Sequence, residues 1–97
     1  MAYVVTAKWT AKEGQADVIA AALAKLAVPS RAEPGMLMYQ LHRDPENPHV
    51  FFIYEQYRAE EDYRAHGASA HFQQHGVAEG FPFLESRERA FYETWDV

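Results

Sequence analysis

The sequence predicts an α+β fold in which the elements follow the order βαββαβ and helices cover one face of a four-stranded antiparallel sheet. Three observations carry this prediction. Four segments have the length and composition of strands, and residues 3–9 are rich in the β-branched and aromatic residues that suit the pleated surface of a sheet. Apolar residues at helical spacing separate the first segment from the second. A turn of five residues joins the second segment to the third, so these two are expected to pair.

The first of these segments, residues 3–9 (Y-V-V-T-A-K-W), is predicted to be a strand. A helix should follow, because the next apolar residues recur on one helical stripe. These residues are Val18, Ile19, Ala22, Leu23 and Leu26. Pro29 either ends this helix at Val28 or kinks it before a last turn through Arg31, because an internal proline removes one hydrogen bond. The sequence leaves both alternatives open.

Two further strands are predicted at residues 36–43 and 49–57. The first of them follows a turn at residues 33–35 (E-P-G). Between the two strands, residues 44–48 (D-P-E-N-P) contain two prolines, which cannot continue a ladder but readily form a turn. We therefore expect these strands to be antiparallel neighbours.

The C-terminal part of the chain is predicted to hold two short helices and a strand. Residues 59–66 carry three acidic residues in their first turn, where negative charge complements the helix dipole. Ser69 is the expected N-cap of a second helix at residues 70–78, because its hydroxyl can accept a free backbone N–H. Residues 80–84 are expected to form a loop. Residues 87–94 are more polar and predict a strand at the sheet edge.

This element order is that of the ferredoxin-like fold, with a predicted strand order of 4-1-3-2. It supplies helices for only one face of the sheet. The strand that contains Phe51, Phe52, Ile53 and Tyr54 is apolar on both faces, so the bare face also needs a cover. We therefore expect a homodimer in which sheet packs against sheet, with the tail at residues 95–97 reaching the partner.

Length and composition narrow the classes of partner. A chain of 97 residues fits a single domain over residues 1–97. The net charge of -5 has the wrong sign for neutralising phosphates, which disfavours a nucleic acid or an anionic membrane surface as a partner. The chain has no cysteine and no apolar run long enough to span a bilayer. We expect a soluble protein of the cytoplasm.

Several short motifs together resemble the antibiotic biosynthesis monooxygenase family. They are Glu33-Pro34-Gly35, Asp44-Pro45, the Y-E-x-Y motif at residues 54–57, and His66-x-x-Ser69-x-His71-Phe72. The resemblance extends over nearly the whole chain, and the pair Y-E-x-Y and H-x-x-S-x-H-F is its most specific part. It implies a dimeric α+β barrel of the ferredoxin-like type.

The resemblance also implies a range of activities. Some family members oxidise quinols or polyketide phenols with molecular oxygen and use neither a metal nor a flavin. Others degrade haem, isomerise a phosphorylated signalling sugar or have no known activity. The haem-degrading members use an asparagine, a tryptophan and a histidine where this chain has Ala7, His66 and Gly76, with His75 one place out of step. The departure at all three positions disfavours haem degradation.

His66 is the leading candidate for a catalytic residue. A histidine titrates near pH 6.5, so it can accept a phenolic proton and later return it. The alternative is that His66 only bonds a backbone group at a helix end. His71 is a second candidate, as a proton relay that orients a substrate hydroxyl, although it can equally serve as a local helix cap.

A metal site is not expected. His71 and His75 are four residues apart, a spacing that places two imidazoles on one face of a helix. A third ligand would have to come from His66 or Glu79, and the H-E-x-x-H pattern is missing. The expected set of cofactors is therefore empty.

Aromatic residues and one carboxylate are the candidates for substrate binding. An aromatic substrate would be stacked by aromatic walls, although plain core packing explains most of these rings equally well. The candidates are Trp9, Tyr39, Glu55, Tyr57 and Phe72. Glu55 lies in an apolar strand, so it needs an ionic partner or a raised pKa. An ion pair with Arg43, Arg87 or Arg89 is the favoured expectation.

These observations leave two classes of function. The first is a cofactor-independent monooxygenase that oxidises a small quinol or phenolic compound with molecular oxygen. The second is a dimeric domain of the same fold that catalyses no reaction and either binds a small ligand or is associated with the stress response. An isomerase of a small signalling metabolite on the same fold is a further alternative. The sequence does not separate them.

Overall fold

A computed structural model describes residues 1–97, and its elements follow the predicted order with one additional helical turn. The elements are β1 (Tyr3–Ala11), α1 (Ala16–Arg31), β2 (Met36–Arg43), β3 (Val50–Tyr57), α2 (Glu60–Ala68), η1 (Phe72–Ala78), η2 (Phe81–Phe83) and β4 (Leu84–Glu93). The segment η1 is a π-helix and η2 is a single 3-10 turn. The predicted α+β arrangement is confirmed.

The strands form one antiparallel sheet in the order β2-β3-β1-β4, which is the predicted order read from the other edge. Ala7 lies opposite Ile53 of β3 on one side and Arg89 of β4 on the other. Because side chains alternate along a strand, every second residue of β1 from Val5 to Ala11 faces the helices. The sheet therefore presents Arg89 to the same interior as the core residue Ile53.

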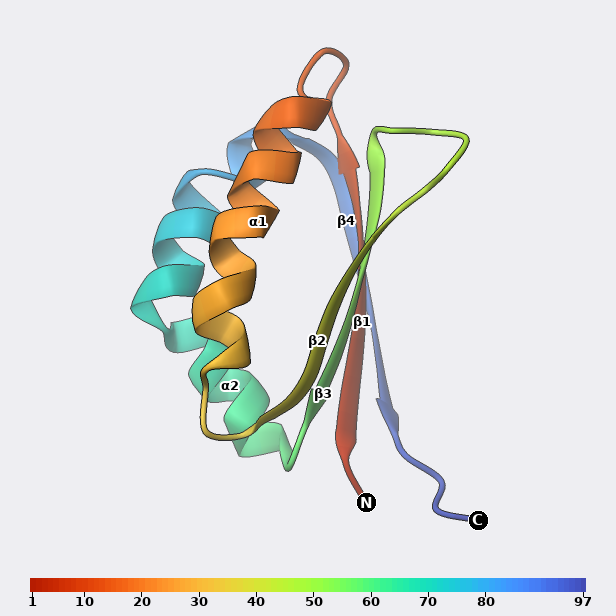
Figure 1. The fold of residues 1–97 in the computed structure, drawn as a ribbon, viewed down its shortest axis with the longest axis vertical. Helices are drawn as coiled ribbons and strands as arrows, with labels where there is room; N and C mark the ends of the chain where they lie inside the picture. Colours follow the sequence, from red (N-terminus) through yellow and green to blue (C-terminus); the bar gives the residue numbers. More distant parts are fainter.

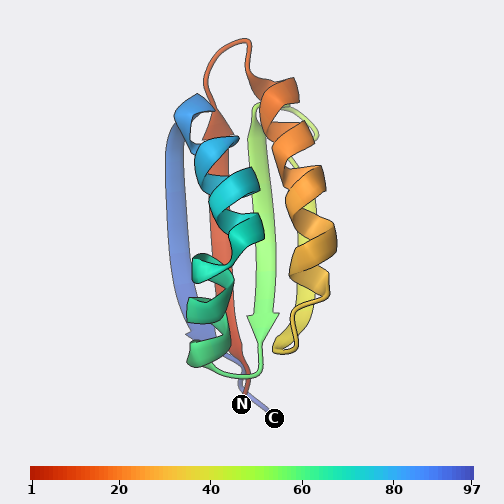
Figure 2. The same ribbon diagram turned by 90° about the vertical axis from the view of Figure 1, so that its left-hand side faces the viewer.

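All helices lie on one face of the sheet, and the two chain ends lie close together at one end of the molecule (Figures 1 and 2). The opposite face has no covering layer in Figure 1. Met38, Phe52 and Tyr92 on this outer face are 51%, 40% and 57% exposed. We refer to these three residues as the outer sheet patch.

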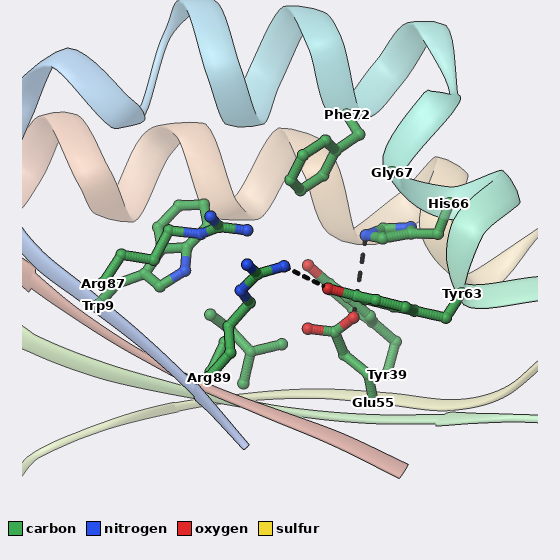
Figure 3. Close-up of a pocket in the computed structure, with 11 residues that line it drawn as sticks. Trp9, Tyr39, Glu55, Tyr63, His66, Gly67, Phe72, Arg87 and Arg89 are labelled. Carbon is green, nitrogen blue, oxygen red and sulfur yellow. Dashed lines mark hydrogen bonds and ion pairs between the residues drawn. The ribbon is translucent and has the colours of Figure 1, made fainter. Parts of the chain in front are cut away.

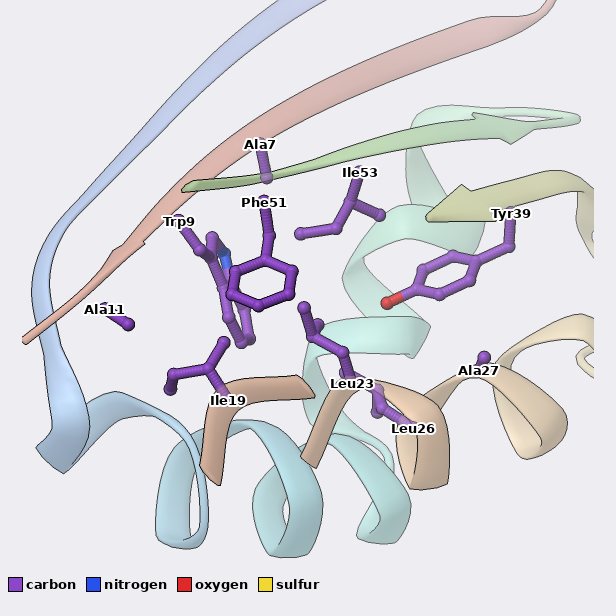
Figure 4. Close-up of a cluster of buried hydrophobic side chains, with 10 residues drawn as sticks. All are labelled: Ala7, Trp9, Ala11, Ile19, Leu23, Leu26, Ala27, Tyr39, Phe51 and Ile53. Atoms are coloured by element: carbon purple, nitrogen blue, oxygen red, sulfur yellow. The ribbon is translucent and has the colours of Figure 1, made fainter. Parts of the chain in front are cut away.

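The hydrophobic core lies between α1 and the central strands (Figure 4). It consists of Ala7, Trp9, Ala11, Ile19, Leu23, Leu26, Ala27, Tyr39, Phe51 and Ile53. The helical stripe predicted from the sequence supplies Ile19, Leu23 and Leu26, whereas Val18 is 38% exposed. Burial of such side chains is the main favourable contribution to folding.

The structure decides between the two alternatives left open at Pro29. Helix α1 continues past this proline and ends at Arg31. Pro29 lies in the last turn, where the backbone N–H of Ala32 donates to its carbonyl. A proline so near the helix end interrupts only one bond of an otherwise complete ladder, and the helix tolerates it.

Ser69 separates the two predicted short helices as expected. Its backbone is extended, and its hydroxyl accepts the backbone N–H of Phe72 at 3.2 Å while donating to the carbonyl of His66 at 2.6 Å. The same residue thus ends α2 and caps the following helix. Most of the helix predicted at residues 70–78 is the π-helix η1, in which, for example, the N–H of Glu79 donates to the carbonyl of Gln74 five residues earlier.

The last strand begins earlier than predicted, and the expected loop at residues 80–84 is largely the turn η2. Strand β4 starts at Leu84, three positions before Arg87. It lies at the sheet edge, as its polar composition indicated. None of the helices combines the length and the hydropathy that crossing a bilayer requires.

The substitution Leu26→Ala should lower the free energy of unfolding by about 2 to 5 kcal/mol, because it leaves a cavity beneath α1. Leu26 is 1% exposed. The matched variant Val28→Ala changes a side chain of the same helix that is 72% exposed, and it should shift stability by less than about 0.5 kcal/mol. Urea unfolding followed by circular dichroism measures both. Equal effects of the two variants would contradict this placement of the core.

Candidate functional site

A cavity of about 80 Å³ lies between the sheet and the segment that contains α2 and η1 (Figure 3). Its walls come from all four strands and from both helical segments. The lining residues are Ala7, Trp9, Tyr39, Ile53, Glu55, Tyr63, His66, Gly67, Phe72, Arg87 and Arg89. Aromatic rings therefore share one space with an imidazole, a carboxyl group and two guanidinium groups.

His66 lies near the end of α2 and is 2% exposed. Its Nδ1 atom lies 2.7 Å from Oε2 of Glu33, which belongs to the turn between α1 and β2. His71 approaches the same oxygen, with its Nε2 atom at 2.6 Å. One carboxylate thus connects two histidines that are distant from it along the chain.

The contact with Glu33 defines how His66 presents its other nitrogen. An ionised carboxylate only accepts hydrogen bonds, so Nδ1 of His66 carries the proton and Nε2 keeps a free lone pair. This Nε2 atom lies 4.0 Å from Oε1 of Glu55 across the cavity wall. The arrangement makes Nε2 the atom of His66 that can accept a proton from a bound molecule.

Burial lowers the pKa of His66 below 6.5 because the charged imidazolium loses its hydration. The hydrogen bond and the negative charge of Glu33 act in the opposite direction, and His71 adds to the lowering. Tyr39, Tyr57 and Phe72 pack their rings against the imidazole. His66 therefore stays neutral, and able to act as a base, at a lower pH than an exposed histidine does.

Glu55 points from β3 into the cavity and is 6% exposed. Burial raises its pKa to about 7, although the hydrogen bond from Tyr57 and the charges of Arg87 and Arg89 oppose this effect. The hydroxyl of Tyr57 donates to Oε1 of Glu55. This carboxyl group therefore keeps its proton to a higher pH than an exposed glutamate does.

The favoured prediction of an ion pair between Glu55 and an arginine is wrong. Arg43 lies over the ring of Phe51, and the guanidinium carbon of Arg87 lies 4.3 Å from the ring centre of Phe81. Arg89 donates to the hydroxyl of Tyr63 at 2.7 Å. Instead, the buried carboxyl group of Glu55 accepts a hydrogen bond from the hydroxyl of Tyr57, and its raised pKa favours the neutral, protonated form.

The cavity brings together five of the seven residues predicted for the site. Trp9, Tyr39, Glu55, His66 and Phe72 line it. Tyr57 is fully buried and bonds Glu55, and His71 bonds the same Glu33 oxygen as His66, but neither residue is among those that line the cavity. These two residues hold the lining groups and do not themselves face the cavity.

Glu33 and Tyr63 were not predicted as site residues, and Arg87 and Arg89 were expected only as ionic partners of Glu55. The two arginines carry a readable signal, because residues two apart in a strand face the same side of a sheet. Glu33 carries none, since its separation from His66 by 33 positions hides the contact. Tyr63 lies within the helix predicted at residues 59–66, and no sequence pattern distinguishes it as a site residue.

Glu33, His66 and His71 also form a donor set of a type that binds metal ions, with all three donor atoms within 4.8 Å of one another. Both imidazole nitrogens lie at direct hydrogen-bond distance from the same oxygen, closer than the roughly 3.3 Å between ligands around a tetrahedral zinc ion. The geometry is that of a hydrogen-bonded triad. His75, which is four residues from His71, takes no part in this set, because its Nδ1 atom lies 2.8 Å from Oε1 of Glu79.

The fold and the cavity define a small ferredoxin-like domain with an ionisable, aromatic-walled site. The family model described as antibiotic biosynthesis monooxygenase matches residues 2–76. The chain therefore belongs to the antibiotic biosynthesis monooxygenase family, as the resemblance of its motifs indicated. No curated protein matches the chain.

Solved structures share this fold over nearly their whole length. PA3566 from Pseudomonas aeruginosa is 29% identical, with 98% of this chain and 95% of that chain covered and a TM-score of 0.91. Rv0793 from Mycobacterium tuberculosis is 20% identical over 100% and 98%, with a TM-score of 0.90. A structure described as an antibiotic biosynthesis monooxygenase is 21% identical over 99% and 100%, with a TM-score of 0.88.

The raised pKa of Glu55 predicts a stability that falls as the pH rises. The unfolded chain releases this proton near pH 4.5 and the folded chain near pH 7, so folding loses on the order of 3 kcal/mol between these values. Glu55→Gln keeps an oxygen for Tyr57 but does not titrate. Its stability relative to the wild type should increase from pH 4.5 to pH 7.5 in urea unfolding.

The matched control for this comparison is Glu88→Gln, which removes an exposed carboxylate of β4. It should not reproduce the increase between the two pH values. A constant difference between Glu55→Gln and the wild type at both pH values would show that Glu55 ionises normally in the folded protein.

Proposed function

We propose that this protein is a monooxygenase that oxidises a small quinol or phenolic compound with molecular oxygen, and that His66 is its catalytic base. The observation that carries the proposal is the orientation of His66. Glu33 holds the Nδ1 side of the ring, and the basic Nε2 atom faces a cavity with aromatic walls. Membership of the monooxygenase family supports the reaction class.

The spacing of His66 and Glu55 suits a substrate hydroxyl. Nε2 of His66 and Oε1 of Glu55 are 4.0 Å apart. An oxygen atom placed about 2.8 Å from each would form hydrogen bonds with both groups. His66 then removes the hydroxyl proton, while Glu55 in its protonated form donates to the resulting oxygen.

Deprotonation is the step that a protein can most effectively promote in such a reaction. A phenolate gives an electron to triplet oxygen far more readily than a neutral phenol does. The resulting radical pair forms a carbon–oxygen bond, and the imidazolium returns its proton to the peroxide. Loss of water then leaves a new carbonyl on the ring. One oxygen atom enters the substrate, the other leaves as water, and the quinol supplies all four electrons.

The remaining groups of the site support these steps. Phe72, Tyr39 and Trp9 enclose an aromatic ring and exclude water from the radical pair. A cavity of about 80 Å³ suits one ring better than the four of a polycyclic polyketide. His71 is partly exposed and shares Glu33 with His66, so it provides a route for protons between the cavity and solvent.

We further propose that the functional unit is a homodimer. The outer sheet patch leaves Met38, Phe52 and Tyr92 in water on a face that no helix covers. A second copy packed sheet against sheet would bury this patch and complete an α+β barrel. The exposed tail around Trp95 extends from the same end as the N-terminus and is in a position to contact the partner.

The substitution His66→Gln should lower the turnover number for a hydroquinone at least tenfold, because a positioned base contributes about 100-fold or more. Glutamine can still donate to Glu33, which preserves the buried contact. Oxygen uptake by metal-stripped protein measures the rate. The control His75→Gln changes a histidine that bonds Glu79 outside the cavity and should leave the rate intact.

The rate should rise with pH along a limb centred below pH 6.5, because burial lowers the pKa of His66 and the neutral form is the base. Glu33→Gln should move this limb to still lower pH, since the Glu33 carboxylate raises the pKa of His66.

An unchanged rate in His66→Gln would refute the role of His66 as the base. If no quinol or phenol consumes oxygen, the ligand-binding or isomerase alternative takes the place of this proposal.

A homodimer predicts a solution mass of about 22 kDa, twice the 11.1 kDa of the chain. Phe52→Glu places a charge at the centre of the outer sheet patch and should shift the mass toward that of one chain in light scattering. Val28→Glu places the same charge on the exposed side of α1 and should keep the dimer. A folded wild-type monomer at micromolar concentration would refute the dimer.

A further inference from the structure

We propose that the cavity recognises an aromatic substrate that carries a carboxylate, with Arg87, Arg89 and the indole N–H of Trp9 as the groups that bind this anion. The inference deepens the proposed function, on which it rests for the ring and its hydroxyl. The anion-binding part stands on contacts that His66 and Glu55 do not make. Figure 3 shows both arginine side chains extending into the cavity.

Arg87 is the first group that lacks a partner. Its guanidinium group packs on the ring of Phe81, and its Nε atom is buried with no hydrogen-bond acceptor. A buried donor without an acceptor is unfavourable, because it has given up its hydrogen bonds to water and gained none in the protein. Burial and the neighbouring Arg89 lower the pKa of Arg87, although Tyr63 and Glu55 act in the opposite direction, and no carboxylate forms an ion pair with it.

Trp9 is the second group without a partner. Its side chain is 3% exposed and lines the same cavity, yet its Nε1–H has no acceptor. Buried tryptophans normally place this N–H on an acceptor. Trp9 and Arg87 lie opposite each other in the β1–β4 pairing, on the side of the sheet that faces the helices. Two unsatisfied donors thus lie next to each other.

Arg89 lies two residues further along β4, on the same side of the sheet. It is exposed, and its only bond within the cavity is to the neutral hydroxyl of Tyr63. This places a second positive charge where the cavity meets solvent. An anion would meet Arg89 first and then reach Arg87, despite the net charge of -5 on the whole chain.

A carboxylate matches these donors better than another anion does. It is planar, and the guanidinium fork binds planar oxyanions through two parallel hydrogen bonds. It also adds little volume to a single ring, which suits a cavity of about 80 Å³. The ring would span the distance between the two sites, with its hydroxyl at His66 and its carboxylate at the arginines.

The test compares two ligands that differ only in this group, hydroquinone and 2,5-dihydroxybenzoate. Binding is measured by calorimetry without oxygen, so that no turnover is required. The acid should bind at least tenfold more tightly than hydroquinone. Arg87→Met should weaken binding of the acid by roughly 10- to 100-fold, the usual effect of one charge-assisted hydrogen bond, and leave hydroquinone unaffected.

Two further variants keep the test decisive. Trp9→Phe retains the buried ring and removes only the N–H, so it should weaken binding of the acid severalfold even if Arg87→Met folds poorly. Arg64→Met removes an exposed arginine that pairs with Glu60 and should change neither affinity. Equal binding of the two ligands, or equal weakening of both by Arg87→Met, would overturn the inference. Binding that depends on Arg87 without any oxygen uptake would uphold the anion site and reject the proposed function.

Discussion

The shared carboxylate of Glu33 is the interaction on which the rest of the site depends. It joins the turn after α1 to α2 and to the residues that lead into η1, across separations of 33 and 38 positions. Without this partner, the buried imidazole of His66 would have an unpaired N–H donor in an apolar environment, which would destabilise the folded protein. The same contact fixes the tautomer of His66. The Glu33 carboxylate thus both pairs the buried His66 side chain and determines which of its ring nitrogens carries the proton.

Much of the fold could be predicted because local patterns determine it. The stripe formed by Ile19, Leu23 and Leu26 indicated the first helix, and the order of the elements together with the turn at residues 44–48 was sufficient to indicate the strand order. Element ends were harder to predict, because tertiary contacts decide them. Helix α1 continues through Pro29 since only one bond is lost, and β4 starts at Leu84 because its pairing with Ala11 extends the ladder.

The site could be predicted only in part. Aromatic residues, Glu55 and His66 attracted attention as unusual residue types in their segments. The contact between His66 and Glu33 was not predictable, since the two residues are 33 positions apart and meet only after the chain has folded. The expected ion pair at Glu55 failed for the same reason. A strand pattern indicates which side of the sheet a residue faces but not which neighbour its side chain contacts. In the structure, the carboxyl group of Glu55 bonds the hydroxyl of Tyr57 and no arginine.

The position of β4 separates the two proposed tasks of the site. The proposed base, His66, belongs to helix α2, whereas both of the proposed anion-binding arginines project from a strand at the sheet edge. Replacing residues at alternate positions of such a strand leaves the backbone ladder and the imidazole undisturbed. Relatives with the same chemistry could therefore diversify in the acids or neutral compounds they accept through β4 alone.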